Sequence, residues 1–119
     1  MKLIHGSKAP LALHLGLCLT DRRAAAVEYS RGACGEIGFL TGVELITFGL
    51  RVVEMEGFGE GESGDAPGDT AEDLAAMAED GIDVVTFEDE VAGMDERHQT
   101  WRIVSEKALA ACRVLGSVK

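Results

Sequence analysis

The sequence lacks the residue patterns that mark several common classes of protein. Its three cysteines, Cys18, Cys34 and Cys112, are odd in number and far apart, so neither a disulfide framework nor a zinc site is expected. The apolar run at residues 11–19 is interrupted by a histidine and a glycine, and it is too short to span a bilayer or to act as a secretory signal. These absences predict free thiols and a cytoplasmic protein.

Three kinds of catalytic centre also lack their usual residues. The histidines, His5, His14 and His98, show neither the i, i+4 spacing nor the cysteine partners of a metal site, so no metal is expected. No serine stands at a strand–elbow–helix turn of the kind that carries the nucleophile of many hydrolases. The one glycine-rich segment, residues 56–69, carries five acidic residues that would repel a phosphate. Metal-dependent, hydrolase and nucleoside-triphosphatase functions are therefore disfavoured.

The chain has the length and composition of a single soluble domain over residues 1–119, with 46% hydrophobic residues. Its net charge of −10 is unevenly spread, because residues 54–99 hold sixteen acidic residues and one basic residue. Such a block repels nucleic acid directly but could imitate a phosphate backbone for a basic partner. The alternative is a set of solvated faces that only confer solubility.

Hydrophobic periodicity predicts a small α+β domain with helices packed on a twisted sheet. Segments that are rich in β-branched and aromatic residues, or apolar at every second position, are predicted as extended or strand segments. They are residues 3–4, 11–19, 36–45, 50–55, 82–87 and 100–104. Segments that follow a capping residue and carry apolar positions at helical spacing are predicted as helices. They are residues 22–30, the stretch between Thr70 and Gly81, and residues 106–115, with an extension of the last helix back to Trp101 as an alternative.

Polar residues and glycines are expected to set the limits of these elements. The predicted helix caps are Thr20 or Asp21, Asp69 or Thr70, and Ser105. The predicted connections are a turn at residues 5–7, a flexible acidic loop at residues 56–69 and an acidic connection at residues 88–97.

Three short motifs supply chemical groups that could act together. His5-Gly6-Ser7 offers an imidazole and an approachable backbone, Tyr29 offers an aromatic face, and Glu88-Asp89-Glu90 offers a carboxylate. An imidazole can bind ribose hydroxyls, an aromatic face can stack on a nicotinamide ring, and a fixed negative charge can stabilise a developing cation. Taken singly, the motifs are more typical of a turn, a half-buried aromatic residue and a solvated acidic segment.

In this order, the motifs resemble those of ADP-ribosyltransferases of the His–Tyr–acid type, especially the small phage-encoded transferases. The residues that carry the resemblance are 4–7, 16–21, 24–29, 81–90 and 100–104. The resemblance implies an ADP-ribosyltransferase-like fold and an NAD-dependent mono-ADP-ribosyltransferase activity, encoded by a phage or mobile element. Because some of these phage proteins are anti-CRISPR proteins, the implied acceptor is a host protein such as a CRISPR–Cas component.

The resemblance also implies a role for each motif. His5 would bind a ribose of NAD, with Gly6 and Ser7 beside it, and Tyr29 would stack on the nicotinamide ring. Asp89 would face the ribose carbon that loses nicotinamide, with Glu88 or Glu90 as the alternative acid. A different hypothesis is a non-catalytic inhibitor that binds a basic, nucleic-acid-binding host complex without NAD. Its candidate contact residues are Glu72, Asp73, Asp95 and Glu96.

Overall fold

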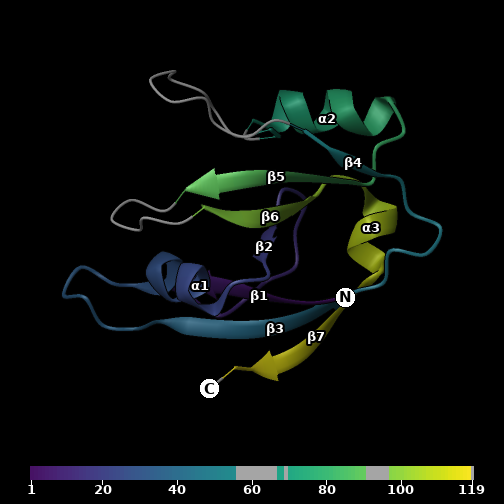
Figure 1. The fold of residues 1–119 in the computed structure, drawn as a ribbon. Helices are drawn as coiled ribbons and strands as arrows, with labels where there is room; N and C mark the ends of the chain where they lie inside the picture. The colour runs from purple at the N-terminus through teal and green to yellow at the C-terminus, as the bar shows by residue number, and fades with distance from the viewer. Residues whose placement is uncertain (56–66, 69, 91–96, 119) are drawn as a thin grey trace.

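The computed structural model describes residues 1–55, 67–68, 70–90 and 97–118 (Figure 1). Over these residues the chain forms one mixed sheet of seven strands and three helices. The strands are β1 (Lys2–Ser7), β2 (Cys18–Thr20), β3 (Phe39–Leu45), β4 (Val52–Glu54), β5 (Val84–Glu90), β6 (Arg97–Ile103) and β7 (Cys112–Ser117). The helices are α1 (Arg23–Ser30), α2 (Ala71–Glu79) and α3 (Glu106–Ala110). The predicted α+β class is confirmed.

The strands follow the order β4-β5-β6-β2-β1-β3-β7 across the sheet. All neighbouring pairs are antiparallel except β4 and β5, which run parallel at one edge. One paired position, Ile4 with Thr20, joins β1 to β2, whereas β5 and β6 pair along seven positions. The central β1–β2 junction is therefore the least extensively paired part of the sheet interior.

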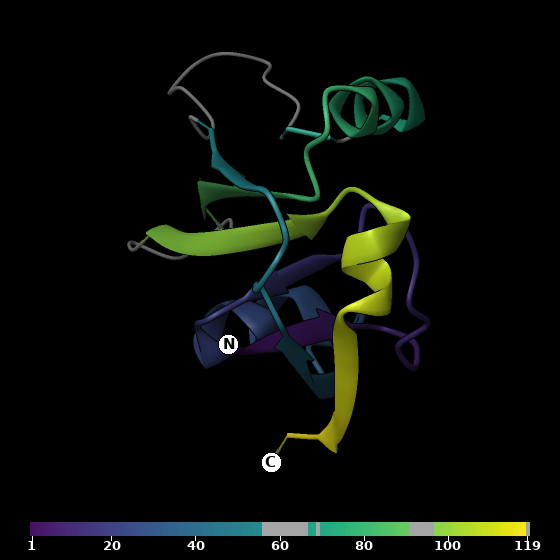
Figure 2. The same cartoon turned by 90° about the vertical axis from the view of Figure 1, so that its right-hand side faces the viewer.

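Two helices cover one face of the sheet at different places. On α1, Ala26 and Val27 pack against Leu40 of β3, and on α2, Met77 packs with Val85 and Phe87 of β5. Leu40, Val85 and Phe87 lie on the same face of the sheet. Paired residues of neighbouring strands share a face, and so does every second residue along one strand. Figures 1 and 2 show α1 beside β1 and β3, and α2 beside the β4–β5 end.

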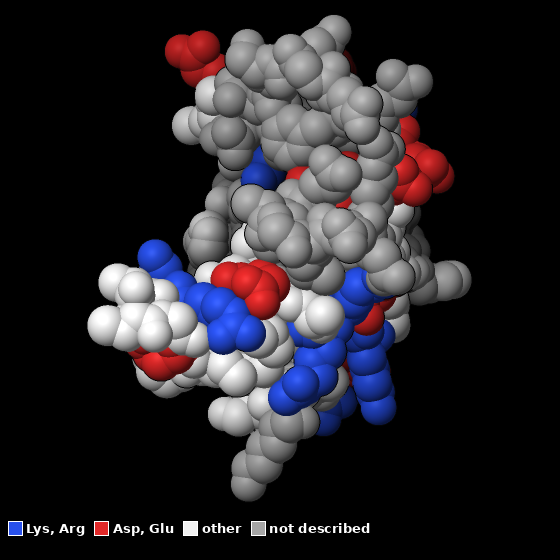
Figure 3. All heavy atoms as spheres, turned by 60° about the vertical axis from the view of Figure 1, so that its left-hand side comes forward, with Lys and Arg blue, Asp and Glu red and all other residues white. Residues whose placement is uncertain are grey.

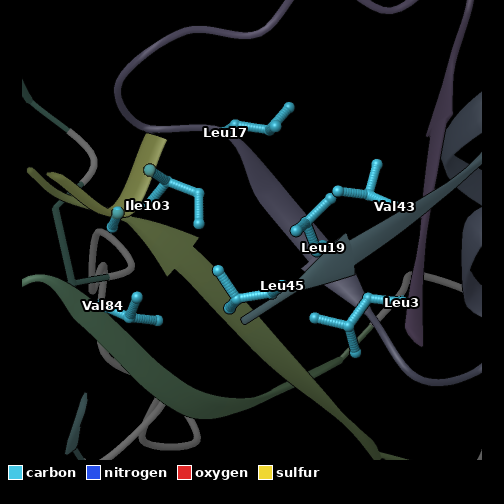
Figure 4. Packing of buried hydrophobic residues seen from close by; sticks show 8 residues of the cluster. Leu3, Leu17, Leu19, Val43, Leu45, Val84 and Ile103 are labelled. Atoms are coloured by element: carbon cyan, nitrogen blue, oxygen red, sulfur yellow. The ribbon is translucent and has the colours of Figure 1, made fainter. Parts of the chain in front are cut away.

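The main hydrophobic core lies on the other face of the sheet. Side chains from five strands and the segment before β2 gather there (Figure 4), and α3 contributes Ala108. They are Leu3, Leu17, Leu19, Val43, Leu45, Val84 and Ile103. Each is at most 2% exposed, so burial of this face supplies much of the apolar stabilisation of the fold.

Close packing of α1 on β1 requires a glycine at position 6. A Cβ atom at Gly6 would lie 1.8 Å from the carbonyl oxygen of Ala26, a distance that no side chain could accept. Gly6 therefore lets α1 lie directly on β1, and any larger residue would push the helix away.

Three helix predictions are confirmed at their N-terminal ends. α1 and α2 begin within one residue of the predicted positions, and Thr70 caps α2 by accepting a hydrogen bond from the Asp73 amide at 3.0 Å. Ser105 caps α3 in the same way, through the Ala108 amide at 3.1 Å. The predicted cap of the first helix, Thr20 or Asp21, is wrong, because the N-cap position is Arg22 and no side chain caps it there.

The turn that was expected at residues 5–7 is wrong. β1 continues through Ser7, because His5, Gly6 and Ser7 pair with Thr41, Leu40 and Phe39 of β3. The extended segment at residues 11–19 forms a strand only from Cys18, and Leu13 and Leu15 are each 39% exposed. A strand needs a partner, and alternation of leucines does not provide one.

The expected acidic connection at residues 88–97 is also wrong at both of its ends. Glu88, Asp89 and Glu90 belong to β5, and their paired positions in β6 are Gln99, His98 and Arg97. Backbone pairing with a neighbouring strand here overrides the low strand propensity of acidic residues. Most of the predicted flexible loop at residues 56–69 lies outside the described residues.

The predicted helix at residues 106–115 is wrong beyond Ala110. α3 ends there, and β7 pairs with β3 at the edge of the sheet. The alternative extension back to Trp101 is wrong as well, because Trp101 lies in β6 opposite Leu19 and Thr86. Residues with a helical pattern over a short stretch can follow tertiary pairing instead. No helix among the described residues has the length and apolar character needed to cross a membrane.

Candidate functional site

Four polar side chains from four different elements meet on the face of the sheet that α1 covers. The Tyr29 hydroxyl of α1 lies 3.2 Å from Oδ2 of Asp89 on β5 and 3.1 Å from Nε2 of His98 on β6. Nδ1 of His98 lies 3.1 Å from Oγ1 of Thr20 on β2. We call Thr20, Tyr29, Asp89 and His98 the tyrosine cluster.

The sheet register explains why these residues meet. Asp89 is paired directly with His98, and Thr20 is paired with Thr100, two residues from His98 on the same face of β6. Tyr29 reaches them from α1. One turn earlier in this helix, Ala26 packs directly against Gly6 of β1. The geometry therefore depends on two strand pairs, β5–β6 and β2–β6, and on the packing of α1 against β1.

The hydrogen bonds of the tyrosine cluster run in one direction. The Tyr29 hydroxyl has one proton and donates it to Asp89, so Nε2 of His98 must donate to the Tyr29 oxygen. A neutral His98 then accepts at Nδ1 from the Thr20 hydroxyl, and Thr20 accepts from the Arg22 amide at 3.2 Å. Every atom of this chain of hydrogen bonds is satisfied when His98 carries its proton on Nε2.

Burial differs sharply among the members of the tyrosine cluster. His98 and Thr20 are each 3% exposed, whereas Tyr29 is 43% exposed. The rings of Tyr29 and His98 meet edge to face, with centroids 5.7 Å apart and an interplanar angle of 74°. The cluster is therefore anchored in the protein at its histidine and open to solvent at its tyrosine.

Electrostatics keep the Tyr29 phenol protonated. Burial raises its pKa well above the usual range, and the Asp89 carboxylate raises it further through its charge and its hydrogen bond. Cys18 adds a smaller rise, and the Arg102 guanidinium opposes these effects. Tyr29 is therefore a neutral hydrogen-bond donor that fixes the position of Asp89.

A buried arginine lies near the tyrosine cluster on the same face of β6. Nε of Arg102 donates to Sγ of Cys18 at 3.0 Å, and Nη1 donates to the Pro67 carbonyl oxygen at 2.6 Å. Its guanidinium carbon lies 5.7 Å from the centroid of the Phe87 ring. Arg102 therefore places a positive charge near the tyrosine cluster, and it links residue 67 to the sheet.

The structure does not bring His5 to the tyrosine cluster. Alternation along β1 places His5 on the face that carries Leu3, opposite the face that α1 covers. Its Nδ1 atom donates to the Cys18 carbonyl oxygen at 2.9 Å. Gly6 faces Ala26 of α1, and the Ser7 hydroxyl donates to the Ala9 carbonyl oxygen. All three residues thus have partners within the protein.

Only one of the three consecutive acids meets Tyr29 in the described structure. Alternation along β5 places Glu88 on the opposite face from Asp89, where it is paired with Gln99. The side chain of Glu90 lies outside the described part of the chain. Between Glu88 and Asp89, the geometry selects Asp89 as the partner of the aromatic residue.

The candidate contact residues of the acidic surface do not form one described site. Glu72 is exposed on α2, but the Asp73 carboxylate accepts a hydrogen bond from the Gly68 amide at 2.6 Å. Asp95 and Glu96 lie outside the described residues. On the face in Figure 3, lysine and arginine side chains gather over the half of the molecule that holds α1, β1 and β3.

Within the described ranges, no group of three or more histidine, cysteine or acidic residues could hold a metal ion.

Comparison of the chain with protein-family models, with curated proteins and with solved structures found no match.

Sequence reasoning missed His98 and Thr20 as members of the site. His98 was considered only as a metal ligand, and Thr20 only as a helix cap. A β5–β6 hairpin extended to Asp89 would have placed His98 opposite that residue, which is the signal that could have found it. The acidic composition of residues 88–90 concealed this hairpin.

Proposed function

We propose that the protein is an NAD-dependent mono-ADP-ribosyltransferase with an ADP-ribosyltransferase-like fold, and that Asp89 and Tyr29 form its reactive centre. The observation that carries this proposal is the 3.2 Å contact between Tyr29 and Asp89, two side chains 60 residues apart in the sequence. The resemblance of the sequence motifs had paired an aromatic residue with an acid from this segment. In the folded chain these two groups are neighbours.

The chemistry of the reaction gives each group a use. Loss of nicotinamide leaves positive charge on the ribose, and a fixed carboxylate stabilises that charge without having to reorganise. Asp89 is held by the neutral Tyr29 hydroxyl, so its position is set before substrate arrives. Because Tyr29 is 43% exposed, part of its ring remains available for a flat ligand such as nicotinamide.

His5, Gly6 and Ser7 enter the proposal as NAD contacts outside the reactive centre. Because these three residues contact other parts of the protein, the proposal rests on Asp89 and Tyr29. We therefore expect His5→Ala to reduce labelling less than Asp89→Asn does. The proposed acceptor is a host protein, in keeping with a phage or mobile-element origin and an anti-CRISPR role.

Incubation of the purified protein with labelled NAD and a host lysate tests this function. Asp89→Asn should lower the rate of label transfer by about 10²-fold or more, because the charge acts mainly in the transition state. Glu88→Gln is the matched control, since it removes a neighbouring charge from the other face of the same strand. Tyr29→Phe keeps the ring and removes the hydroxyl, so it separates stacking from the anchoring of Asp89.

Two results would contradict the proposal. One is the absence of NAD binding even at millimolar concentration, which corresponds to a binding free energy of about 4 kcal/mol. The other is equal loss of labelling in Asp89→Asn and Glu88→Gln, because then the position of the charge would not matter. Inhibition of a basic host complex without NAD binding would favour the acidic inhibitor instead.

A further inference from the structure

His98 is a deeply buried member of the tyrosine cluster, and the proposed reaction does not use it. It is 3% exposed, yet both of its ring nitrogens have polar neighbours at 3.1 Å, the Tyr29 hydroxyl at Nε2 and the Thr20 hydroxyl at Nδ1. The Thr100 hydroxyl and the Gln99 carbonyl oxygen lie further from Nδ1, at 3.4 Å each, so the Thr20 hydroxyl is its nearest partner. A buried imidazole whose hydrogen bonds are satisfied on both sides has one preferred proton position and one preferred ring orientation. That orientation determines where the Tyr29 oxygen lies.

Tyr29 needs such a fixed support, because it lies on the last turn of α1 and is partly exposed. A hydroxyl at such a place would otherwise exchange its partner for water, and an ordinary hydrogen bond contributes only about 1 kcal/mol against that exchange. The Nε2–H donor of His98 occupies a lone pair of the Tyr29 oxygen, so the remaining proton of the hydroxyl is directed to Asp89.

We propose that His98 and Thr20 are positioning residues that direct the Tyr29 hydroxyl to Asp89. Thr20 donates to Nδ1 and thereby holds the proton of His98 on Nε2, and His98 donates to the Tyr29 oxygen. Neither residue contacts the reacting atoms. The effect of this device on turnover rests on the proposed function, whereas the proton position on His98 can be measured without any substrate.

The proton position can be read from the ¹⁵N chemical shifts of the imidazoles. The sequence has three histidines, so the loss of one set of signals in His98→Gln assigns those of His98. We expect neutral His98 to show a protonated Nε2 and an unprotonated Nδ1. In Thr20→Val, which keeps the side-chain shape but removes the hydroxyl donor, the Nδ1 signal should move, and in Thr20→Ser it should return to the wild-type position. A neutral His98 protonated on Nδ1, or a Thr20→Val spectrum that equals the wild type, would overturn the proposal.

Kinetics with NAD provide the second arm of the experiment. Thr20→Val should lower kcat roughly tenfold with little change in KM, because it loosens the reactive centre without removing a substrate contact. Thr20→Ser should restore kcat, which a loss of packing alone would not explain. If kcat is unchanged in Thr20→Val while the Nδ1 signal moves, the positioning role is refuted. If the wild type shows no activity with NAD, the proposed function fails, and the ¹⁵N shifts still decide whether Thr20 and His98 hold the phenol as we propose.

Discussion

Replacement of Gly6 by alanine separates two explanations for the same glycine. The motif resemblance assigns Gly6 to the approach of NAD, whereas the structure shows it in contact with Ala26 of α1. A new Cβ would lie 1.8 Å from the Ala26 carbonyl oxygen, so α1 would have to retreat by about 1.2 Å to reach even 3.0 Å. Because Tyr29 is one turn further along the same helix, that movement would also lengthen its 3.2 Å contact with Asp89.

The expected cost of Gly6→Ala follows from this clash. Overpacking of a closely packed interior usually costs about 1–3 kcal/mol, and here the nearest atoms belong to backbone, which cannot turn aside as a side chain can. We therefore expect the free energy of unfolding to fall by about 2–3 kcal/mol. Urea unfolding followed by the fluorescence of Trp101, the only tryptophan, would measure it.

Gly35→Ala is the control for a glycine replacement without a clash. Gly35 has a φ of +80°, and nothing lies within 4 Å of the position of its Cβ, so only the left-handed backbone conformation should be costly, by about 1 kcal/mol. If Gly6→Ala loses no more stability than Gly35→Ala, the close contact between Gly6 of β1 and Ala26 of α1 is refuted. A stable Gly6→Ala protein that has lost NAD binding would show that the cofactor explains the glycine.

Three further measurements test the electrostatics of the fold. Tyr29 is the only tyrosine, so tyrosinate absorbance should show no ionisation near pH 10, which is about the ordinary pKa of a tyrosine. Asp89→Asn should move the ionisation of Tyr29 to lower pH, and an unchanged titration would refute the electrostatic effect of Asp89 on Tyr29. The pKa of Asp83 is lowered by a backbone amide and a serine hydroxyl, so its stabilising effect is present above the unfolded-state pKa of about 4 and disappears as pH falls through the folded-state pKa. The difference in unfolding free energy between wild type and Asp83→Asn should therefore shrink in acid, and a constant difference would contradict this. Burial raises the pKa of Cys112, so a thiol reagent at neutral pH should modify the exposed Cys34 first, and the reverse order would be inconsistent with the structure.

The tyrosine cluster shows how far motif reasoning reaches in this protein. Sequence order and residue chemistry paired Tyr29 with an acid in residues 88–90, and the structure places Tyr29 and Asp89 in contact. The same reasoning grouped His5 with them, but strand alternation puts His5 on the other face of the sheet. A linear motif specifies residue types and spacing, whereas the face of a strand is specified only when its register is known.

Local signals in the sequence determined the helix starts and the general class of the fold. Thr70 and Ser105 could be recognised as caps because each hydroxyl accepts a hydrogen bond from a backbone amide only three residues further along the chain. Such a bond needs no partner from a distant part of the chain. Tertiary pairing alone decided that residues 88–90 extend β5, that residues 112–117 form β7 rather than a helix, and that His98 lies beside Tyr29. These features depend on partners tens of residues away, and their stability comes from interstrand hydrogen bonds and burial that no local pattern contains.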